Sequence, residues 1–150
     1  MAKKIDEVDK VILEILQDDA RTAFRKIAAK AGLSEAAVFA RVKKLQKKGV
    51  IRRFTALVSP EMLGKSLTAF VLVSSDPKKL HTVLETLSSM DDVYEVYDVT
   101  GTYYAIAKIR TKDREKLANI IDEIGLIEGV TSTETALVLR CMKEETRVKP

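Results

Sequence analysis

Basic side chains gather in one short stretch of this 150-residue sequence. Seven of the thirteen residues from Arg41 to Arg53 are lysine or arginine, and none of the thirteen is acidic. A solvated helix face usually mixes glutamate with lysine, whereas a cationic segment without acids suits the phosphates of a nucleic acid. The seven basic residues are Arg41, Lys43, Lys44, Lys47, Lys48, Arg52 and Arg53.

The charge is unevenly distributed along the chain. The net charge of +4 is by itself a weak argument for any partner. Residues 1–58 carry 14 basic and 7 acidic side chains, whereas residues 59–150 carry 12 and 15. We therefore expect two units of opposite net charge that have different partners.

The composition excludes several classes of protein. With 46% apolar and 32% charged residues, the chain can bury a core and is not disordered throughout. We find no apolar run long enough to span a membrane and no basic segment that leads into an apolar signal region. These features predict a cytoplasmic protein that has no membrane partner.

An acidic cluster offers the alternative of an enzyme. Paired carboxylates can act as acid and base or bind a hard cation, but acids in a loop before a strand are usually solvated, and no nucleophile accompanies these. The single His81 and the single Cys141 cannot form a zinc site or a disulfide within one chain. We expect no enzyme, no metal site and no cofactor. The acids are Asp91, Asp92, Glu95 and Asp98.

Three helices are predicted before residue 50. Apolar residues recur at helical spacing from about Asp6 to Asp18. Thr22 is a candidate N-cap for a short second helix that ends at Gly32, and Ser34 is a candidate cap for a third helix that ends near Gly49. Two helices so close together must cross steeply, which predicts a helix-turn-helix.

The third helix has a distinct outward face. If Val38, Val42 and Leu45 point inward, small residues face outward at its start and lysines at its end. A helix that enters the major groove N-terminus first would place Ser34 to Ala40 near base edges and the cations near phosphates. The predicted DNA-binding residues are Ser34, Glu35, Ala36, Phe39, Ala40, Arg41, Lys43, Lys44, Lys47, Arg52 and Arg53.

The predicted domains are residues 1–50, a linker strand and hinge over 51–65, and a second domain over 66–150. Residues 50–58 are rich enough in β-branched and aromatic side chains for a strand, which would serve as a wing or as a linker. Ser59, Pro60 and Gly64 then interrupt the pattern.

The second domain is predicted to alternate strands and helices. Strands are expected over 67–73, 93–99, 103–109 and 130–141, with helices after Asp76 and Pro77 and after Thr111 or Asp113. The order βαββαβ is that of a ferredoxin-like domain, so the fold class is α+β. Because both sides of the first strand are apolar and two helices cover only one face of a sheet, we predict a sheet-on-sheet homodimer. Phe70 and Leu72 lie on the uncovered side.

The sequence resembles the leucine-responsive regulator/AsnC family, also called feast/famine regulators. Nearly the whole chain takes part in the resemblance, which implies a bacterial or archaeal transcription regulator whose dimers assemble into tetramers, octamers or larger discs. The residues that carry the resemblance are Leu33, Ser34, Val38, Arg41, Val42, Leu45, Gly49, Val50, Ile51, Val93, Thr100, Gly101, Tyr103, Gly129 and Val130.

The resemblance also implies an effector, usually an amino acid, beside a loop with the pattern glycine, any residue, aromatic, aspartate. Tyr104 stands where the family has the aspartate that would pair with an ammonium group. Either another acid substitutes, the ligand differs, or no small effector binds. The candidate effector residues are Asp98, Thr100, Gly101, Thr102, Tyr103, Tyr104 and Glu134.

The expected function is therefore that of a sequence-specific regulator that binds palindromic double-stranded DNA as a homodimer or larger assembly. An alternative is a metabolite-binding module that acts on an enzyme. The basic helix-turn-helix favours the regulator over this alternative.

Overall fold

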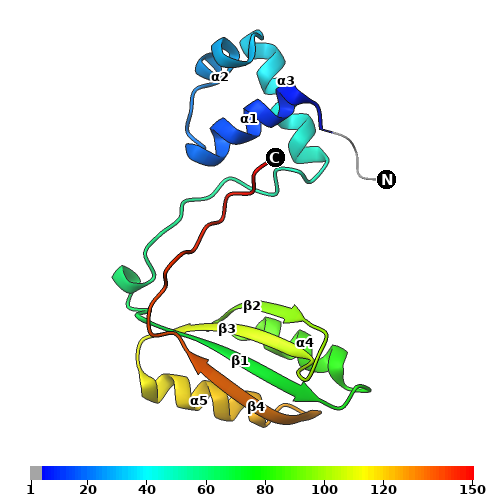
Figure 1. Ribbon diagram of the computed structural model, residues 1–150, viewed down its shortest axis with the longest axis vertical. Coiled ribbons are helices and arrows are strands. Elements are labelled where there is room, and N and C mark those ends of the chain that lie inside the picture. The colour runs from blue at the N-terminus through cyan, green and yellow to red at the C-terminus, as the bar shows by residue number, and fades with distance from the viewer. Residues whose placement is uncertain (1–4) are drawn as a thin grey trace. The chain divides into compact units, whose positions relative to one another are not determined.

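The computed structural model describes residues 5–150 and divides the chain into two units (Figure 1). The first, here called the DNA-binding unit, contains the residues up to Leu57 together with Lys143–Pro150; the second, the sheet unit, contains Val58–Met142. The last eight residues of the chain thus lie with the DNA-binding unit, although residues 66–150 were expected to form one domain.

Helices α1 (Glu7–Asp18), α2 (Phe24–Ala31) and α3 (Glu35–Lys47) form the DNA-binding unit. Asp6 caps α1 in a reciprocal capping box with Asp9. Gly32 ends α2 in the left-handed conformation with φ of 67°, and the Ser34 hydroxyl accepts a hydrogen bond from the Ala37 amide at 3.1 Å. The predicted end of α2 at Gly32 and the predicted cap of α3 at Ser34 are confirmed.

The start of α2 differs from the expectation. Ala23 is the N-cap residue, and no side chain caps this helix. The Thr22 hydroxyl instead donates to the Asp19 carbonyl at 2.8 Å, because the turn between α1 and α2 leaves that carbonyl without a helical partner.

One small core holds the three helices together. Buried apolar side chains from each helix meet there, among them Ile12, Ile27 and Leu45. Val38 and Val42 are buried in the same cluster, as the inward face of α3 predicted. This packing fixes which side of α3 remains exposed.

The predicted strand over 50–58 is absent from the described chain. The amides of Val50 and Ile51 donate to the Leu45 carbonyl and close the end of α3. The chain then runs extended and exposed as far as the short 3-10 helix at Glu61–Leu63, and no described segment pairs with it as a wing or linker strand. β-branched composition favours an extended backbone, but a strand also needs a pairing partner.

The sheet unit has the predicted βαββαβ order. Its elements are β1 (Leu67–Ser75), α4 (Leu80–Ser89), β2 (Val93–Asp98), β3 (Ala105–Thr111), α5 (Arg114–Gly125) and β4 (Val130–Leu137). The strands pair antiparallel in the order β2-β3-β1-β4, as a ferredoxin-like domain requires. The α+β fold class is confirmed.

Several boundaries in the sheet unit differ from the predicted ones. β3 begins at Ala105, so Tyr103 and Tyr104 belong to the preceding loop, and β4 ends at Leu137, four residues before Cys141. Asp76 caps a turn rather than α4, because its carboxylate accepts from the Lys78 amide at 2.8 Å and α4 begins at Leu80. Asp113, not Thr111, caps α5.

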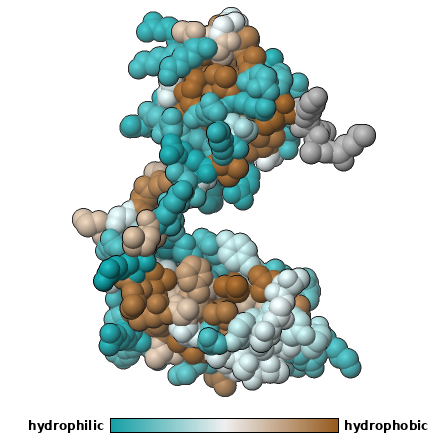
Figure 2. All heavy atoms as spheres, viewed as in Figure 1, coloured by the Kyte–Doolittle hydropathy of each residue, from teal (hydrophilic) through white to brown (hydrophobic). Residues whose placement is uncertain are grey.

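The two faces of the sheet differ in composition. Helices α4 and α5 cover one face, where Ala69, Val71 and Val73 are fully buried (Figure 1). On the open face, Phe70 and Leu72 are partly buried, and Lys108 lies directly across from Phe70. Figure 2 shows apolar residues separated by polar ones over the sheet unit. The open face is therefore mixed, because β3 and β4 contribute charged side chains beside the apolar ones of β1.

Candidate DNA-binding surface and ligand loop

The exposed side of α3 carries most of the predicted DNA-binding residues. Its first two turns present small and acidic side chains, and its last two turns present lysines. The hydroxyl of Ser34 is occupied by capping α3, which leaves its remaining lone pair and its proton for other partners. The exposed members of the set are Ser34, Glu35, Ala36, Phe39, Ala40, Lys43, Lys44 and Lys47.

Phe39 is held in a defined position on this surface. Its ring meets the ring of Phe24 on α2 edge to face, with 6.1 Å between centroids and an interplanar angle of 61°. The Lys43 ammonium lies 5.7 Å from the centre of the Phe39 ring. Half of Phe39 is nevertheless exposed, so the ring can contact an apolar group outside the unit.

Arg41, another of the predicted DNA-binding residues, forms ion pairs within the DNA-binding unit. Its Nη1 lies 2.7 Å from Asp6 Oδ2 and 2.7 Å from Asp9 Oδ1. The Arg41 guanidinium lowers the pKa of the Asp6 carboxyl below its ordinary value through this hydrogen bond. Because two carboxylates already neutralise it, Arg41 joins α3 to the start of α1 instead of offering a free cation.

Further basic side chains lie outside the predicted set. Arg25, Lys26 and Lys30 are exposed on α2, and Arg21 is exposed just before it. They were not predicted from the sequence because other residues are interspersed among them over 21–30, so they do not form a dense basic run like the one from Arg41 to Arg53. In a helix-turn-helix, the helix before the recognition helix crosses the DNA backbone, which is where these cations would matter.

Arg52 and Arg53 are exposed in the extended segment after α3. No described residue forms an ion pair with either of them. They therefore remain candidate phosphate contacts, although the predicted strand that would have presented them is absent.

The predicted effector residues gather around the loop between β2 and β3. The loop is closed by a hydrogen bond of 3.0 Å from the Val99 amide to the Tyr104 carbonyl, and the Tyr104 amide donates to Val73 on β1 at 3.0 Å. Gly101 has a φ of 121°, which a side chain would disfavour. Asp98, Thr100 and Thr102 are exposed around this turn.

The structure brings Tyr103 and Glu134 together across the sheet. The phenol of Tyr103 donates a hydrogen bond to the Glu134 carboxylate on β4, and this bond raises the pKa of Tyr103. Tyr104 is half-buried and is held by its backbone. Of the two acids considered as substitutes for the family's aspartate, Glu134 is thus engaged by the loop, whereas Asp98 lies exposed at the end of β2.

Two other kinds of site are not found among the described residues. No group of three or more histidine, cysteine, aspartate or glutamate side chains in that part of the chain could hold a metal ion. None of its helices is long and apolar enough to cross a membrane.

A capped recognition helix with a cationic surface, followed by a separate ferredoxin-like unit, defines the class of two-domain helix-turn-helix transcription regulators. The AsnC-type helix-turn-helix domain matches residues 5–46, and the Lrp/AsnC ligand binding domain matches residues 68–148. The chain belongs to the Lrp/AsnC family of transcription regulators, and it is not an enzyme.

Its relatives support this assignment along the whole chain. It is 43% identical over 148 residues to the HTH-type transcriptional regulator FL11 of Pyrococcus horikoshii, covering 99% of this chain and 98% of that protein. It is 46% identical over 140 residues to the regulator LrpA of the same organism, covering 93% and 99%. The structure of AsnC from E. coli matches with a TM-score of 0.92 at 34% identity, covering 98% and 99%. The enzyme-regulating module considered as an alternative is not favoured.

Proposed function

We propose that this regulator reads imperfectly palindromic double-stranded DNA by placing α3 of two protomers in successive major grooves. The main support is the exposed face of α3, which presents small and acidic side chains where the helix begins and lysines where it ends. Half-sites would lie about one helical turn apart or a multiple of it, because two-fold symmetric dimers present their recognition helices at that spacing. Such a regulator works in the cytoplasm of a bacterium or an archaeon, where the DNA lies.

The side chains on α3 divide into two groups. Glu35 suits the amino group of a cytosine, and Ala36, Ala40 and the exposed edge of Phe39 suit thymine methyl groups. Lys43, Lys44 and Lys47 suit phosphates, which supply most of the affinity and make it dependent on salt. Arg41 is left out of this second group because Asp6 and Asp9 neutralise it.

Phosphate contacts from outside α3 complete the surface in this proposal. Arg52 and Arg53 follow α3 in the chain, and Lys26 and Lys30 are exposed on α2. These cations carry no base specificity, but each phosphate contact steepens the salt dependence of binding.

The open face of the sheet is the proposed dimer contact. It exposes parts of Phe70, Leu72 and Ile106 that the helices do not cover. A second copy would bury them, and the further assembly into tetramers or octamers rests on the family alone. Sedimentation at micromolar concentration tests this step, and a folded monomer would contradict it.

The effector is proposed to bind beside Tyr103 and Glu134. The ammonium group of a ligand such as an amino acid would donate to the Glu134 carboxylate in place of the Tyr103 hydroxyl, and the match to a ligand-binding domain supports this reading. Thermal unfolding in the presence of each of the twenty amino acids tests it, with Glu134→Gln as the variant that should lose any shift. A shift that survives in Glu134→Gln would place the ligand elsewhere.

DNA binding is tested most directly with the promoter region of the protein's own gene, because such regulators often bind there. A gel shift that is competed by unlabelled promoter DNA but not by unrelated DNA is the expected result. Equal competition by both would leave only non-specific electrostatic binding.

A further inference from the structure

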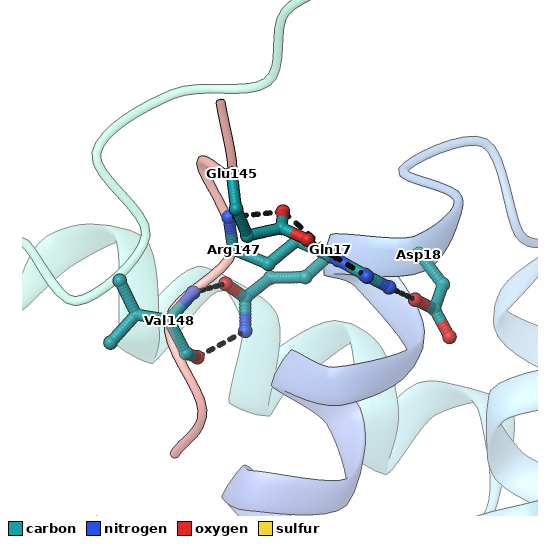
Figure 3. A network of polar contacts seen from close by, with 5 residues as sticks. All are labelled: Gln17, Asp18, Glu145, Arg147 and Val148. Atoms are coloured by element: carbon teal, nitrogen blue, oxygen red, sulfur yellow. Dashed lines mark hydrogen bonds and ion pairs between the residues drawn. The ribbon is translucent and has the colours of Figure 1, made fainter. Parts of the chain in front are cut away.

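The C-terminal segment Lys143–Pro150 lies against the end of helix α1 in the DNA-binding unit (Figure 3). The Gln17 side-chain amide makes two hydrogen bonds to the backbone of one residue. Its Nε2 donates to the Val148 carbonyl at 2.9 Å, and its Oε1 accepts from the Val148 amide at 2.7 Å. A side chain that satisfies both backbone groups of one residue fixes the position of that residue along α1.

An ion pair adds to this contact. The Arg147 guanidinium binds the Asp18 carboxylate and is itself held by Glu145, whose carboxylate lies 2.9 Å from Nη2 (Figure 3). Arg147 lowers the pKa of Glu145 to about 2, because its guanidinium donates hydrogen bonds to that carboxylate.

The end of α1 has a specific need for this arginine. The helix ends with Asp18 and is followed by Asp19, and its last turn has no basic residue. Two carboxylates at the negative end of a helix dipole are unfavourable, and a cation there is favourable. Arg21 pairs with Asp19 at 3.6 Å, and Arg147 supplies the cation for Asp18 from the far end of the sequence.

The connectivity gives this contact a consequence. The chain passes from the DNA-binding unit to the sheet unit after Leu57 and returns after Met142, five residues beyond the end of β4. We propose that Lys143–Pro150 is a strap that docks in cis on α1 and gives the DNA-binding unit a second attachment to the sheet unit.

The strap would act on binding to paired half-sites. A unit held by two attachments samples fewer positions, so less entropy is lost when the second unit of a dimer meets its half-site. Contact with a single half-site needs no such positioning. This consequence rests on the proposed reading of palindromic DNA, whereas the docking itself does not.

Hydrogen exchange of the full-length protein tests the docking. In Arg147→Ala and in Gln17→Ala, amides of 143–150 and of the last turn of α1 should exchange faster than in the unchanged protein. Lys149→Ala is the matched control, since Lys149 lies on the same segment and makes no hydrogen bond or ion pair with the described residues. Unchanged exchange in all three variants would overturn the docking.

Cross-linking decides whether the strap docks within one chain. Cysteines are placed by Gln17→Cys and Val148→Cys in a Cys141→Ser background, and a short bismaleimide joins them. A product of single-chain size that depends on both cysteines is expected. A product of two-chain size from a mixture of the two single-cysteine proteins would overturn docking in cis.

Affinity for two duplexes tests the consequence. One duplex is selected in vitro by the unchanged protein, and in the other one half-site is scrambled. Arg147→Ala should weaken binding to the paired duplex by about three- to tenfold and leave binding to the single half-site unchanged. Equal loss on both duplexes, or no loss, would overturn the strap. If the unchanged protein selects no duplex, the proposed function fails, while exchange and cross-linking still decide the docking.

Discussion

The Arg41 side chain on α3 lies 2.7 Å from the buried carboxylate of Asp9 on α1. Asp9 is 5% exposed, and its other role is to accept the Asp6 amide in the capping box at 3.3 Å. The same nitrogen of Arg41 also reaches Asp6. One arginine thus connects the start of the first helix with the middle of the recognition helix, beside the apolar core that orients α3.

Removal of this arginine should destabilise the DNA-binding unit. Arg41→Ala leaves the Asp9 carboxylate buried without its cation, which costs about 1–3 kcal/mol. Lys43→Ala, two residues away on the exposed side, should change stability by less than about 0.5 kcal/mol. Denaturant unfolding measures the stability of both variants, and hydrogen exchange shows whether α1 and α3 are the elements affected. A neutral Arg41→Ala would return Arg41 to the phosphate-binding set.

The same contact predicts a dependence on pH. Arg41 lowers the pKa of Asp6 in the folded state, so the contact stabilises the fold at pH values above the unfolded pKa of about 3.9. That contribution disappears as the pH falls through the folded pKa. Between about pH 6 and 2, the midpoint temperature of thermal unfolding should therefore fall more steeply in the unchanged protein than in Arg41→Ala. Parallel curves would contradict the assignment.

Lys44 should contribute charge rather than base recognition. Lys44→Ala is expected to weaken binding to all duplexes alike and to reduce the slope of log affinity against log salt by about 1. Lys78→Ala removes the same charge from an exposed position of the sheet unit and should leave the slope unchanged. Fluorescence anisotropy over a series of salt concentrations measures the slopes. A Lys44→Ala protein with an unaltered slope would remove Lys44 from the DNA surface.

Two glycines of the sheet unit should respond in opposite ways to alanine. Gly129 has a φ of 101°, and a Cβ there would collide with the Cβ of Lys79, so Gly129→Ala should cost about 1–3 kcal/mol. Gly125 ends α5 in open space, and Gly125→Ala should gain about 0.5–1 kcal/mol. Thermal denaturation compares the two variants. An equal change in stability in the two variants would mean that the turn before β4 shifts to accommodate the Cβ of Gly129→Ala.

The Tyr103–Glu134 contact can be followed by titration of the phenol. Glu134 raises the pKa of Tyr103, so the protonated phenol stabilises the fold below the unfolded pKa of about 10, and this contribution is lost as the pH rises through the folded pKa. In Glu134→Gln the pKa of Tyr103 should fall toward its ordinary value. Ultraviolet difference spectra of the two proteins between about pH 8 and 12 measure it, and identical curves would show that the hydrogen bond is absent in solution.

Local patterns in the sequence determined most of the secondary structure. The spacing of Val38, Val42 and Leu45, together with Ser34 before them and Gly49 after them, predicted α3 and its exposed face. The alternation of elements after residue 66 predicted the βαββαβ order. These signals are local, because helical period, caps and turns involve residues only a few positions apart.

The sequence did not predict contacts whose partners lie far away along the chain. Arg41 matched a phosphate-binding run, yet its partners Asp6 and Asp9 are 35 and 32 residues away. Residues 50–58 had the composition of a strand, but no described segment pairs with them. Arg147 and Val148 meet α1 across 129 and 131 residues.

The sequence by itself therefore determined the elements, their order, the family and the cationic face of the recognition helix. Only the tertiary structure decided which cations are already neutralised, which acid faces Tyr103, and that the chain end belongs with the first helix. Periodicity and capping depend on neighbours along the chain, whereas charge pairing and strand pairing depend on which distant segments the folded chain brings into contact.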